Sequence, residues 1–195
     1  MSSWEALAAE IRDCHACSEL AMTRTNVVVG QLPARGAKVL LVGEAPGANE
    51  DLTGIPFVGR AGQLLDQLLA EVGLPRETVA VANVLKCRPP SNRKPTTAEA
   101  NNCRGWLTAQ IAVVGPALIV AMGGTAVEWF FGRGAKIGEL RGRVHSRAGR
   151  RVLATSHPSA AIRFGPRGMP RAALREDLAM AARDELVAAV REVSR

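Results

Sequence analysis

Four cysteines are the residues of this sequence with the clearest capacity for chemistry. Cys14 and Cys17 form a C-x2-C pair, Cys87 follows after 69 intervening residues, and Cys103 follows after 15 more. The first pair lies in a polar stretch, and the third cysteine stands between a lysine and an arginine. Core packing of free thiols does not predict such surroundings. The four thiols therefore indicate a metal site, for which zinc and an iron–sulfur cluster are both suitable.

Disulfide bonds are one alternative interpretation of these cysteines, and packing as unrelated core thiols is another. Residues 1–5 lack the basic stretch and apolar core that begin an export signal. We therefore expect a cytoplasmic protein, in which thiols stay reduced. Structural zinc often uses two close C-x2-C pairs, whereas only one pair is close here. The spacing thus leans toward a cluster but does not separate the two metals.

Three polar residues stand where predicted strands end. Glu44 follows the first apolar run, Asn83 lies near the end of the second, and His157 follows the fourth. They offer a carboxylate, an amide with donor and acceptor, and an imidazole. A lone asparagine at a strand end is more often a turn residue, and a lone histidine is more often structural. These three residues can form one ligand site only if the fold brings their side chains together.

The elements that must position these side chains alternate between strand and helix. Short apolar runs predict strands at residues 38–43, 79–85, 117–122 and 152–155. Periodic apolar residues and capping signals predict helices at about 64–72, 96–107, 125–131 and 170–193. This alternation is typical of an α/β fold with a parallel sheet covered on both faces. Ligands gather at the carboxyl ends of such strands, and no linker or repeat divides the chain, so we expect one domain over residues 1–195.

The net charge of +7 arises from 25 basic and 18 acidic residues and is unevenly distributed. Residues 132–175 contain eleven Lys and Arg against a single acid, Glu139. This excess indicates either a solvated basic surface or a face that neutralises nucleic-acid phosphates. No apolar run approaches the roughly 18 residues of a membrane span, so we expect no membrane contact.

The chain resembles the family 4 uracil-DNA glycosylases, the iron–sulfur type, over nearly its whole length. The motifs that carry the resemblance are residues 26–30, 43–47 (GEAPG) with Glu50 and Asp51, 54–59 (GIPFVG), 83–95 (NVLKCRPPSNRKP) and 157–159 (HPS). The resemblance implies a three-layer α/β/α sandwich around a central four-stranded, mainly parallel sheet. It also implies a [4Fe–4S] cluster on Cys14, Cys17, Cys87 and Cys103.

The activity implied by the resemblance is excision of uracil from single- and double-stranded DNA during base excision repair, leaving an abasic site. We expect a monofunctional enzyme, because no lysine appears as a motif nucleophile, acting as a monomer associated with the nucleoid. The base lies inside a duplex and must be flipped out before it can be reached.

The resemblance also assigns roles in the uracil pocket. Phe57 would stack on the flipped base, the backbone of Ala45 would face it, and Asn83 would pair with uracil O4 and N3–H. His157 would donate a hydrogen bond to O2 as negative charge develops there. Ala45 stands where the wider superfamily has a catalytic aspartate and cannot act as a base.

Other side chains must therefore position the attacking water and contact the DNA. The candidates for the water are Glu44, Glu50 and Asn92, in that order. We expect residues 159–171 to form a loop that enters DNA. Its expected DNA contacts are Ser159, Arg163, Arg167 and Arg171, with the arginines at phosphates or in a groove, and its expected apolar wedges are Ile162 and Phe164.

Two rival functions remain compatible with the residues alone. A nucleic-acid-binding redox sensor would use an iron–sulfur cluster without releasing a base, which leaves Asn83 and His157 without a role. A zinc-stabilised nucleotide-binding domain would lack visible absorbance near 400 nm.

Overall fold

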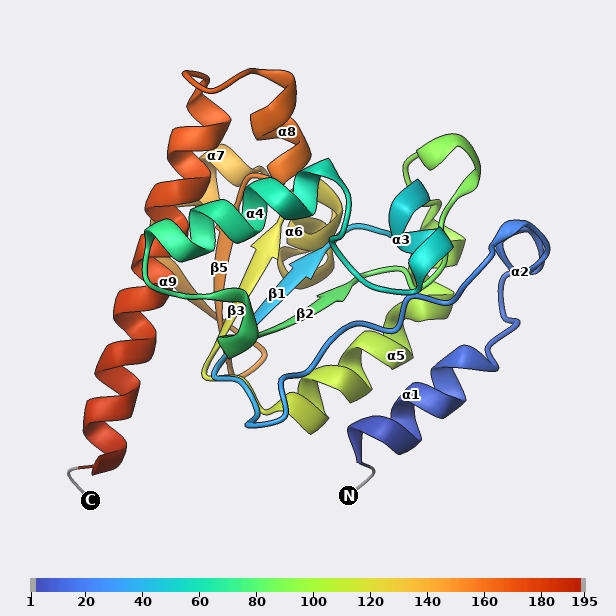
Figure 1. Cartoon of the computed structure of the whole chain (residues 1–195), viewed down its shortest axis with the longest axis horizontal. Helices are drawn as coiled ribbons and strands as arrows, with labels where there is room; N and C mark the ends of the chain where they lie inside the picture. The colour runs from blue at the N-terminus through green and yellow to red at the C-terminus, as the bar shows by residue number, and fades with distance from the viewer. Residues whose placement is uncertain (1–2, 194–195) are drawn as a thin grey trace.

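A five-stranded sheet forms the centre of the protein, which a computed structural model describes over residues 3–193, with side chains through Arg183. The strands are β1 (Val39–Gly43), β2 (Val79–Asn83), β3 (Leu118–Met122), β4 (Val144–Arg147) and β5 (Arg150–Thr155), in the order β2-β1-β3-β5-β4. The four strands predicted from apolar runs are parallel to one another (Figure 1). Each begins and ends within two residues of its predicted bounds.

The fifth strand, β4, corrects the expected four-stranded sheet. It pairs antiparallel with β5 at the sheet edge. Its four residues, VHSR, are half-buried or exposed and so present no apolar run to recognise. Ala148 and Gly149 join the two strands with φ angles of 47° and 74°, the pair of positive angles typical of a two-residue type I′ hairpin.

Nine helices accompany the sheet within the described residues. They are α1 (Trp4–Arg12), α2 (Ser18–Thr23), α3 (Ala48–Thr53), α4 (Arg60–Glu71), α5 (Thr97–Val114), α6 (Gly124–Phe131), α7 (Ile137–Leu140), α8 (Pro158–Arg163) and α9 (Met169–Val193). Short 3-10 turns lie at Arg76–Thr78 and Pro90–Asn92. The predictions of α4, α5, α6 and α9 are confirmed, and none of these helices is long and apolar enough to cross a membrane.

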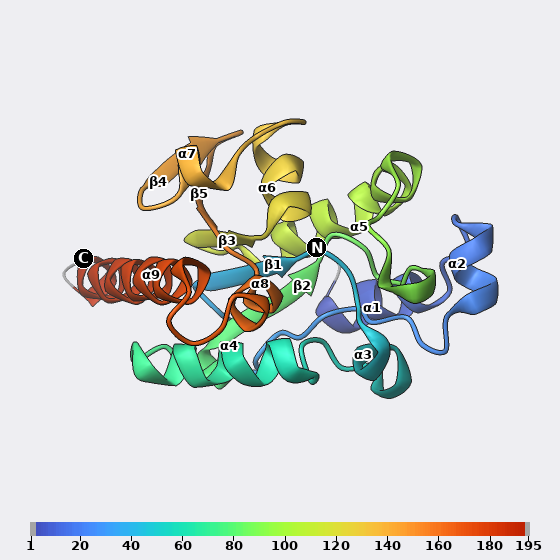
Figure 2. The ribbon, with the colours of Figure 1, turned by 90° about the horizontal axis from the view of Figure 1, so that it is seen from above.

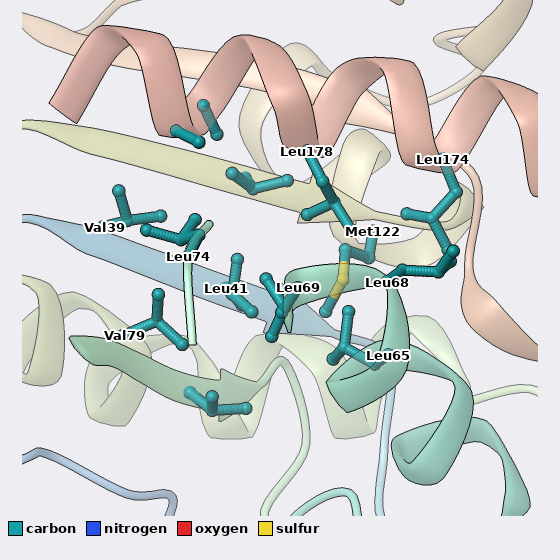
Figure 3. Packing of buried hydrophobic residues seen from close by; sticks show 14 of the residues in the cluster. Val39, Leu41, Leu65, Leu68, Leu69, Leu74, Val79, Met122, Leu174 and Leu178 are labelled. Carbon is teal, nitrogen blue, oxygen red and sulfur yellow. The ribbon is translucent and has the colours of Figure 1, made fainter. Parts of the chain in front are cut away.

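The three-layer α/β/α arrangement is also confirmed. Alternate residues of β1 enter different cores: Val39 and Leu41 pack with α4 and α9, whereas Leu40 and Val42 pack with α5 and α6. Figure 2 shows these two helical layers on opposite sides of the sheet, and Figure 3 shows the first core closely filled by aliphatic side chains. Strands buried on both faces read as continuous apolar runs, which is why the sequence revealed them.

The start of α5 fixes the helix that carries one of the cysteines. Thr96 Oγ1 accepts a hydrogen bond from the Glu99 N–H at 3.2 Å, and Glu99 Oε2 accepts one from the Thr96 N–H at 2.7 Å. This is the predicted capping box, which satisfies two backbone donors that a helix start leaves open. Helix α1 packs against the same helix from outside the sheet.

Residues 159–171 are not the continuous loop that we expected. Their first part is helical, because α8 extends from Pro158 to Arg163, and only a short connection precedes α9. His157 caps α8 through its side chain, which accepts from the Ser159 N–H. Pro158 occupies the first turn of the helix, where its fixed φ favours a helix start.

Candidate active site and cysteine site

A cleft of about 300 Å³ opens at the carboxyl ends of the parallel strands. It brings together nine of the residues singled out in the sequence: Glu44, Ala45, Glu50, Phe57, Asn83, Asn92, His157, Ser159 and Arg163. Pro89 and Arg93 also line it. Arg167 does not; it lies exposed in the connection between α8 and α9. Residues from four separate chain segments thus converge on one hollow.

Asn83 ends β2 at the base of this cleft and is only 2% exposed. Its Oδ1 atom is buried and accepts no hydrogen bond from the side chains of residues 3–183 or from the described main chain. An unsatisfied buried acceptor costs about 1–3 kcal/mol, so its presence in a cleft indicates a ligand that donates to it. Gly43, opposite Asn83 on β1, leaves room for this carboxamide: a Cβ there would lie 2.5 Å from Oδ1.

Phe57 forms the adjoining wall. Its backbone φ is 56°, a strained value for a bulky residue, and helix α4 holds it in place from beneath. A Cβ at Gly62 of that helix would lie 1.7 Å from the Phe57 carbonyl oxygen, so only glycine allows this contact. The Phe57 ring lies 5.9 Å from the His157 ring, tilted by 35°. The two rings therefore border the same space.

His157 is held as a neutral imidazole. Burial lowers its pKa from 6.5 to about 4, although nearby Glu50 acts in the opposite direction. Its Nδ1 lies 3.2 Å from the Ser159 backbone nitrogen. A backbone N–H can only donate, so Nδ1 is the acceptor and the ring proton resides on Nε2. A Cβ at Gly123 would lie 2.9 Å from the His157 Cβ, and this glycine therefore allows the ring to approach β3.

The two candidate carboxylates differ in their hydrogen bonds. Glu50 accepts from the Gly47 N–H at 3.1 Å with one oxygen and from the Gly59 N–H at 2.8 Å with the other. It therefore fixes the loops around Ala45 and Phe57. Glu44 Oε2 accepts a hydrogen bond from the Thr125 hydroxyl at the start of α6, which orients this carboxylate on the opposite side of the cleft.

The segment after β2 supplies the remaining rim. Asn92 has a φ of 55°, and its Oδ1 accepts from Arg88 Nε at 2.7 Å. Arg93 is clamped by both oxygens of Glu99 at 2.7 and 2.9 Å and by Glu19 at 2.9 Å. These contacts connect the cleft to α2 and α5, the two helices beside the cysteines.

The four cysteines line one small cavity on the α5 side of the sheet. Cys14 and Cys17 come from the connection between α1 and α2, Cys87 from the segment after β2, and Cys103 from α5. Among the side chains that the structure describes, those of residues 3–183, no group of three His, Cys, Asp or Glu is arranged to hold a single metal ion. The cysteines nevertheless share one apolar enclosure, as the sequence predicted for a common site.

Hydrogen-bond donors point at the cysteine sulfurs. Trp106 Nε1 lies 3.3 Å from the Cys14 sulfur, Asn102 Nδ2 lies 3.5 Å from that of Cys17, and Arg24 lies 3.2 Å from that of Cys87. Such donors surround thiolate ligands of metal centres and tune them. The donor set therefore fits a metal-bound tetrathiolate.

Burial makes the thiolate form costly in two of the cysteines. It raises the pKa of Cys103 to about 11 and also raises the pKa of Cys87. The positive charges of Lys86 and Arg24 act against this effect. Burial also lowers the pKa of Lys86 to about 8.

Of the expected DNA-contacting residues, Ser159 and Arg163 line the cleft, whereas Arg167 does not. Ser159 and Arg163 are exposed on α8, and Phe164, the next residue, is 65% exposed. Ile162 instead packs against the core between α4 and α9, so it is not available as a wedge. Helical periodicity turns adjacent side chains to different sides, which a loop assignment did not anticipate.

Part of the basic segment is engaged within the protein. Arg141 pairs with Glu176 and Asp177, and Arg171 and Arg175 both pair with Glu71. Buried Asp177 also accepts from Thr155 at 2.7 Å, which ties α9 to β5. The segment is therefore partly structural, and its charge count overstates the surface open to phosphates.

Several residues that shape the cleft were not identified from the sequence. Gly43, Gly62 and Gly123 permit close approaches, Thr125 orients Glu44, and Lys86 lies buried between the two sites. The glycines that end β1 and follow β3 were a usable signal, because glycine at a strand end often marks a close backbone approach. Nothing in a Lys-Cys-Arg sequence predicts full burial of its lysine.

Comparisons with known proteins place these features in a family. The model of the Uracil DNA glycosylase superfamily matches residues 29–179. A type-4 uracil-DNA glycosylase of Thermotoga maritima is 45% identical over 161 residues, covering 82% of this chain and 83% of its own. One of Archaeoglobus fulgidus is 41% identical over 170 residues, covering 83% and 84%. One of Pyrobaculum aerophilum is 40% identical over 178 residues, covering 87% and 88%.

Proposed function

This chain belongs to the uracil-DNA glycosylase superfamily, and from that premise we propose that it removes uracil from DNA as its type-4 relatives are named to do. The observation that carries the proposal is the unpartnered Oδ1 of buried Asn83, which faces the same cleft as neutral His157. We assign the activity to residues 1–195 acting as one domain and as a monomer. The product is an abasic site, the substrate of later steps of base excision repair.

Selection of the base rests on Asn83. Its Oδ1 accepts from uracil N3–H and its amide donates to O4. Cytosine presents the opposite pattern at these two positions, so the same side chain rejects it. Phe57 stacks on the base from the adjoining wall, and the backbone of Ala45 faces the base from the loop after β1. A base reaches this cleft only after it has left the helical stack.

Bond cleavage rests on charge stabilisation. As the bond between uracil and deoxyribose breaks, negative charge develops on uracil O2 and positive character on the sugar. His157, with its proton on Nε2, donates a hydrogen bond to O2, as a preorganised donor does in an oxyanion hole. A neutral ring performs this task without a proton transfer.

The attacking water is assigned to Glu44. Thr125 orients this carboxylate, whereas both oxygens of Glu50 already accept backbone N–H groups. Glu50 therefore supports the two loops and adds negative potential beside the sugar. Asn92, whose Oδ1 is held by Arg88, contacts the nucleotide backbone or the water from the rim.

We assign the four cysteines as the ligands that would hold a [4Fe–4S] cluster. Such a cluster supplies a cross-link between Cys14, Cys17, Cys87 and Cys103, and hydrolysis of an N-glycosidic bond involves no redox step. Arg24, Asn102 and Trp106 support the sulfurs by hydrogen bonds. Ser159 and Arg163 contact DNA at the cleft mouth, Arg167 contacts it from the connection between α8 and α9, and Phe164 is the apolar wedge.

A redox sensor without base release is the less favoured function, because it gives no role to the convergence of Asn83, Phe57 and His157 in one cleft. Iron analysis of the purified protein and its absorbance near 400 nm distinguish an iron–sulfur protein from a zinc-stabilised domain.

The activity is tested with end-labelled oligonucleotides that carry one uracil, as single strands and as duplexes, followed by alkali. We expect strand cleavage at the uracil in both. Asn83→Ala and His157→Ala should slow single-turnover release by about 10²- to 10³-fold, the usual effect of losing a transition-state hydrogen bond. Arg163→Ala should mainly raise Kd for DNA. A wild-type protein that leaves no alkali-labile site would refute the proposal.

A further inference from the structure

Lys86 is a buried lysine that lies between the two sites. It is 1% exposed, and its Nζ donates a hydrogen bond of 2.6 Å to the backbone carbonyl oxygen of Asn83. That carbonyl belongs to the residue that carries the unpartnered Oδ1 in the cleft. Lys86 is thus bonded directly to the backbone from which the base-selecting side chain projects.

The same lysine also lines the cysteine cavity. Its backbone N–H donates to Cys103, and its positive charge acts on the sulfurs of both Cys87 and Cys103. Its own carbonyl accepts from the Val28 N–H at 2.8 Å, which anchors the main chain there. One residue therefore contacts the cysteine site and the cleft at once.

The burial of this ammonium group calls for negative charge nearby. Removing an ammonium ion from water costs several kcal/mol, and the carbonyl bond to Asn83 is a single neutral acceptor for a group with three donors. The ionisable groups whose charge acts on Lys86 are Cys103 and Cys87. Thiolates bound to a metal supply the compensating charge at this place.

The main chain around Asn83 is otherwise well fixed. The N–H of Val84 donates to the Gly43 carbonyl at 2.9 Å, and that of Leu85 donates to the Glu44 carbonyl at 3.0 Å. The Lys86 side chain adds a bond to this turn at the Asn83 carbonyl. Movement of the Lys86 ammonium group would therefore act directly on the Asn83 backbone.

We propose that Lys86 is a positioning residue: held by the metal-loaded cysteines, it fixes the Asn83 backbone and thereby the amide that selects uracil. This inference rests on the proposed function, because it uses Asn83 as the selecting residue. It gives the cysteine site a role beyond cross-linking, since the presence of the metal sets the geometry of base recognition through a single side chain.

The test compares Lys86→Met, Lys86→Gln and the control Lys94→Met in protein purified with its metal. Lys94 has a 65% exposed side chain that pairs with Glu128. Met removes the charge and the donor at similar length, whereas Gln retains a donor. We expect K86M to slow single-turnover release at saturating DNA by tenfold or more with Kd for DNA unchanged. K86Q should recover part of that rate, and K94M should match wild type.

A double-mutant cycle and the metal's own signature make the test specific. If Lys86 acts through Asn83, K86M should cost little further rate in an Asn83→Ala background. Loss of a positive charge beside two thiolates should also make the reduction potential of the bound metal more negative in both K86M and K86Q. Additive losses in the cycle, or an unchanged potential, would overturn the inference.

A variant that fails to fold, and a failure of the proposed function, can each be distinguished from a failure of this inference. If K86M does not fold, judged by circular dichroism, K86Q carries both measurements. If wild-type protein releases no uracil, the proposed function fails, and the potential still decides whether Lys86 senses the metal. An unchanged potential would then overturn the inference as well.

Discussion

His157 shows how a single residue acquires its state from its surroundings. With a folded-state pKa of about 4 and an ordinary value of 6.5, the unfolded chain takes up the proton first as pH falls. The contribution of His157 to stability is therefore intact above about pH 6.5 and is lost progressively toward pH 4. We predict that urea-unfolding free energy falls over this range less steeply in His157→Gln than in wild type.

The same pKa governs activity near neutral pH. His157 should contribute no inflection near pH 6.5 to the pH profile of uracil release, because its ring is already neutral there. The profiles of wild type and His157→Gln should therefore have the same shape around this pH. Parallel stability curves for the two proteins, or a wild-type rate that rises as the histidine is protonated, would show that the ring is not held neutral.

Phe164 offers a second test at this scale. Its exposed ring lies at the C-terminal end of α8, the helix that carries Ser159 and Arg163. An apolar wedge helps only where a base must leave a stack. We predict that Phe164→Ala slows release from duplex DNA by about tenfold and leaves single-stranded substrate nearly unaffected. Met22→Ala, which alters an 80% exposed residue on α2, is the control. Equal losses on both substrates would contradict the wedge.

The residue types of the site could be identified from the sequence, but the contacts that these residues make could not. Glu44, Asn83 and His157 were identified because each stands at or just after the end of an apolar run, and the structure brings them into one cleft. The hydrogen bonds of Glu50 to Gly47 and Gly59 depend on loop geometry that has no periodic signal. The burial of Lys86 depends on packing between distant segments, which local sequence does not encode.

At the scale of elements, the glycine that ends β1 is the most demanding position. A Cβ at Gly43 would meet Asn83 Oδ1 at 2.5 Å and Phe57 Cζ at 2.6 Å. We predict that Gly43→Ala lowers stability by about 1–3 kcal/mol, as overpacking does, and lowers the release rate at least tenfold. Chemical denaturation and single-turnover assays measure these effects.

Gly105 provides the matched control for that change. A Cβ there meets nothing within 4 Å, and the residue lies within α5, where alanine is the better helix former by about 1 kcal/mol. Gly105→Ala should leave activity unchanged and maintain or raise stability. A Gly43→Ala protein as active as Gly105→Ala would show that the close approach does not shape the site.

The elements differ in how clearly the sequence predicts them. The buried strands and long helices α4 and α5 were recognised because apolar runs and capping residues repeat what the fold requires. The edge strand β4 and the helices α1, α2, α3, α7 and α8 were missed, because no continuous apolar run or periodic apolar pattern was recognised in these short segments.

At the scale of the whole molecule, the cysteine site joins the N-terminal helices to the sheet. Cys17→Ser should abolish absorbance near 400 nm and lower the iron content. It should also lower Tm, because the segment between α1 and α2 then loses its cross-link to Cys87 and Cys103. His15→Ala, in the same segment, is the control that should retain iron. Retention of iron and Tm by Cys17→Ser would contradict the assignment of the fourfold site.

The most direct test of the whole account measures the released base itself. The protein is incubated with a duplex that carries one uracil and with matched duplexes that carry thymine or cytosine at that position. Free bases and oligonucleotide masses are then quantified by mass spectrometry. We predict one free uracil for each abasic site formed, and no thymine or cytosine. Intact uracil-containing DNA after incubation with iron-loaded protein would contradict the central claim.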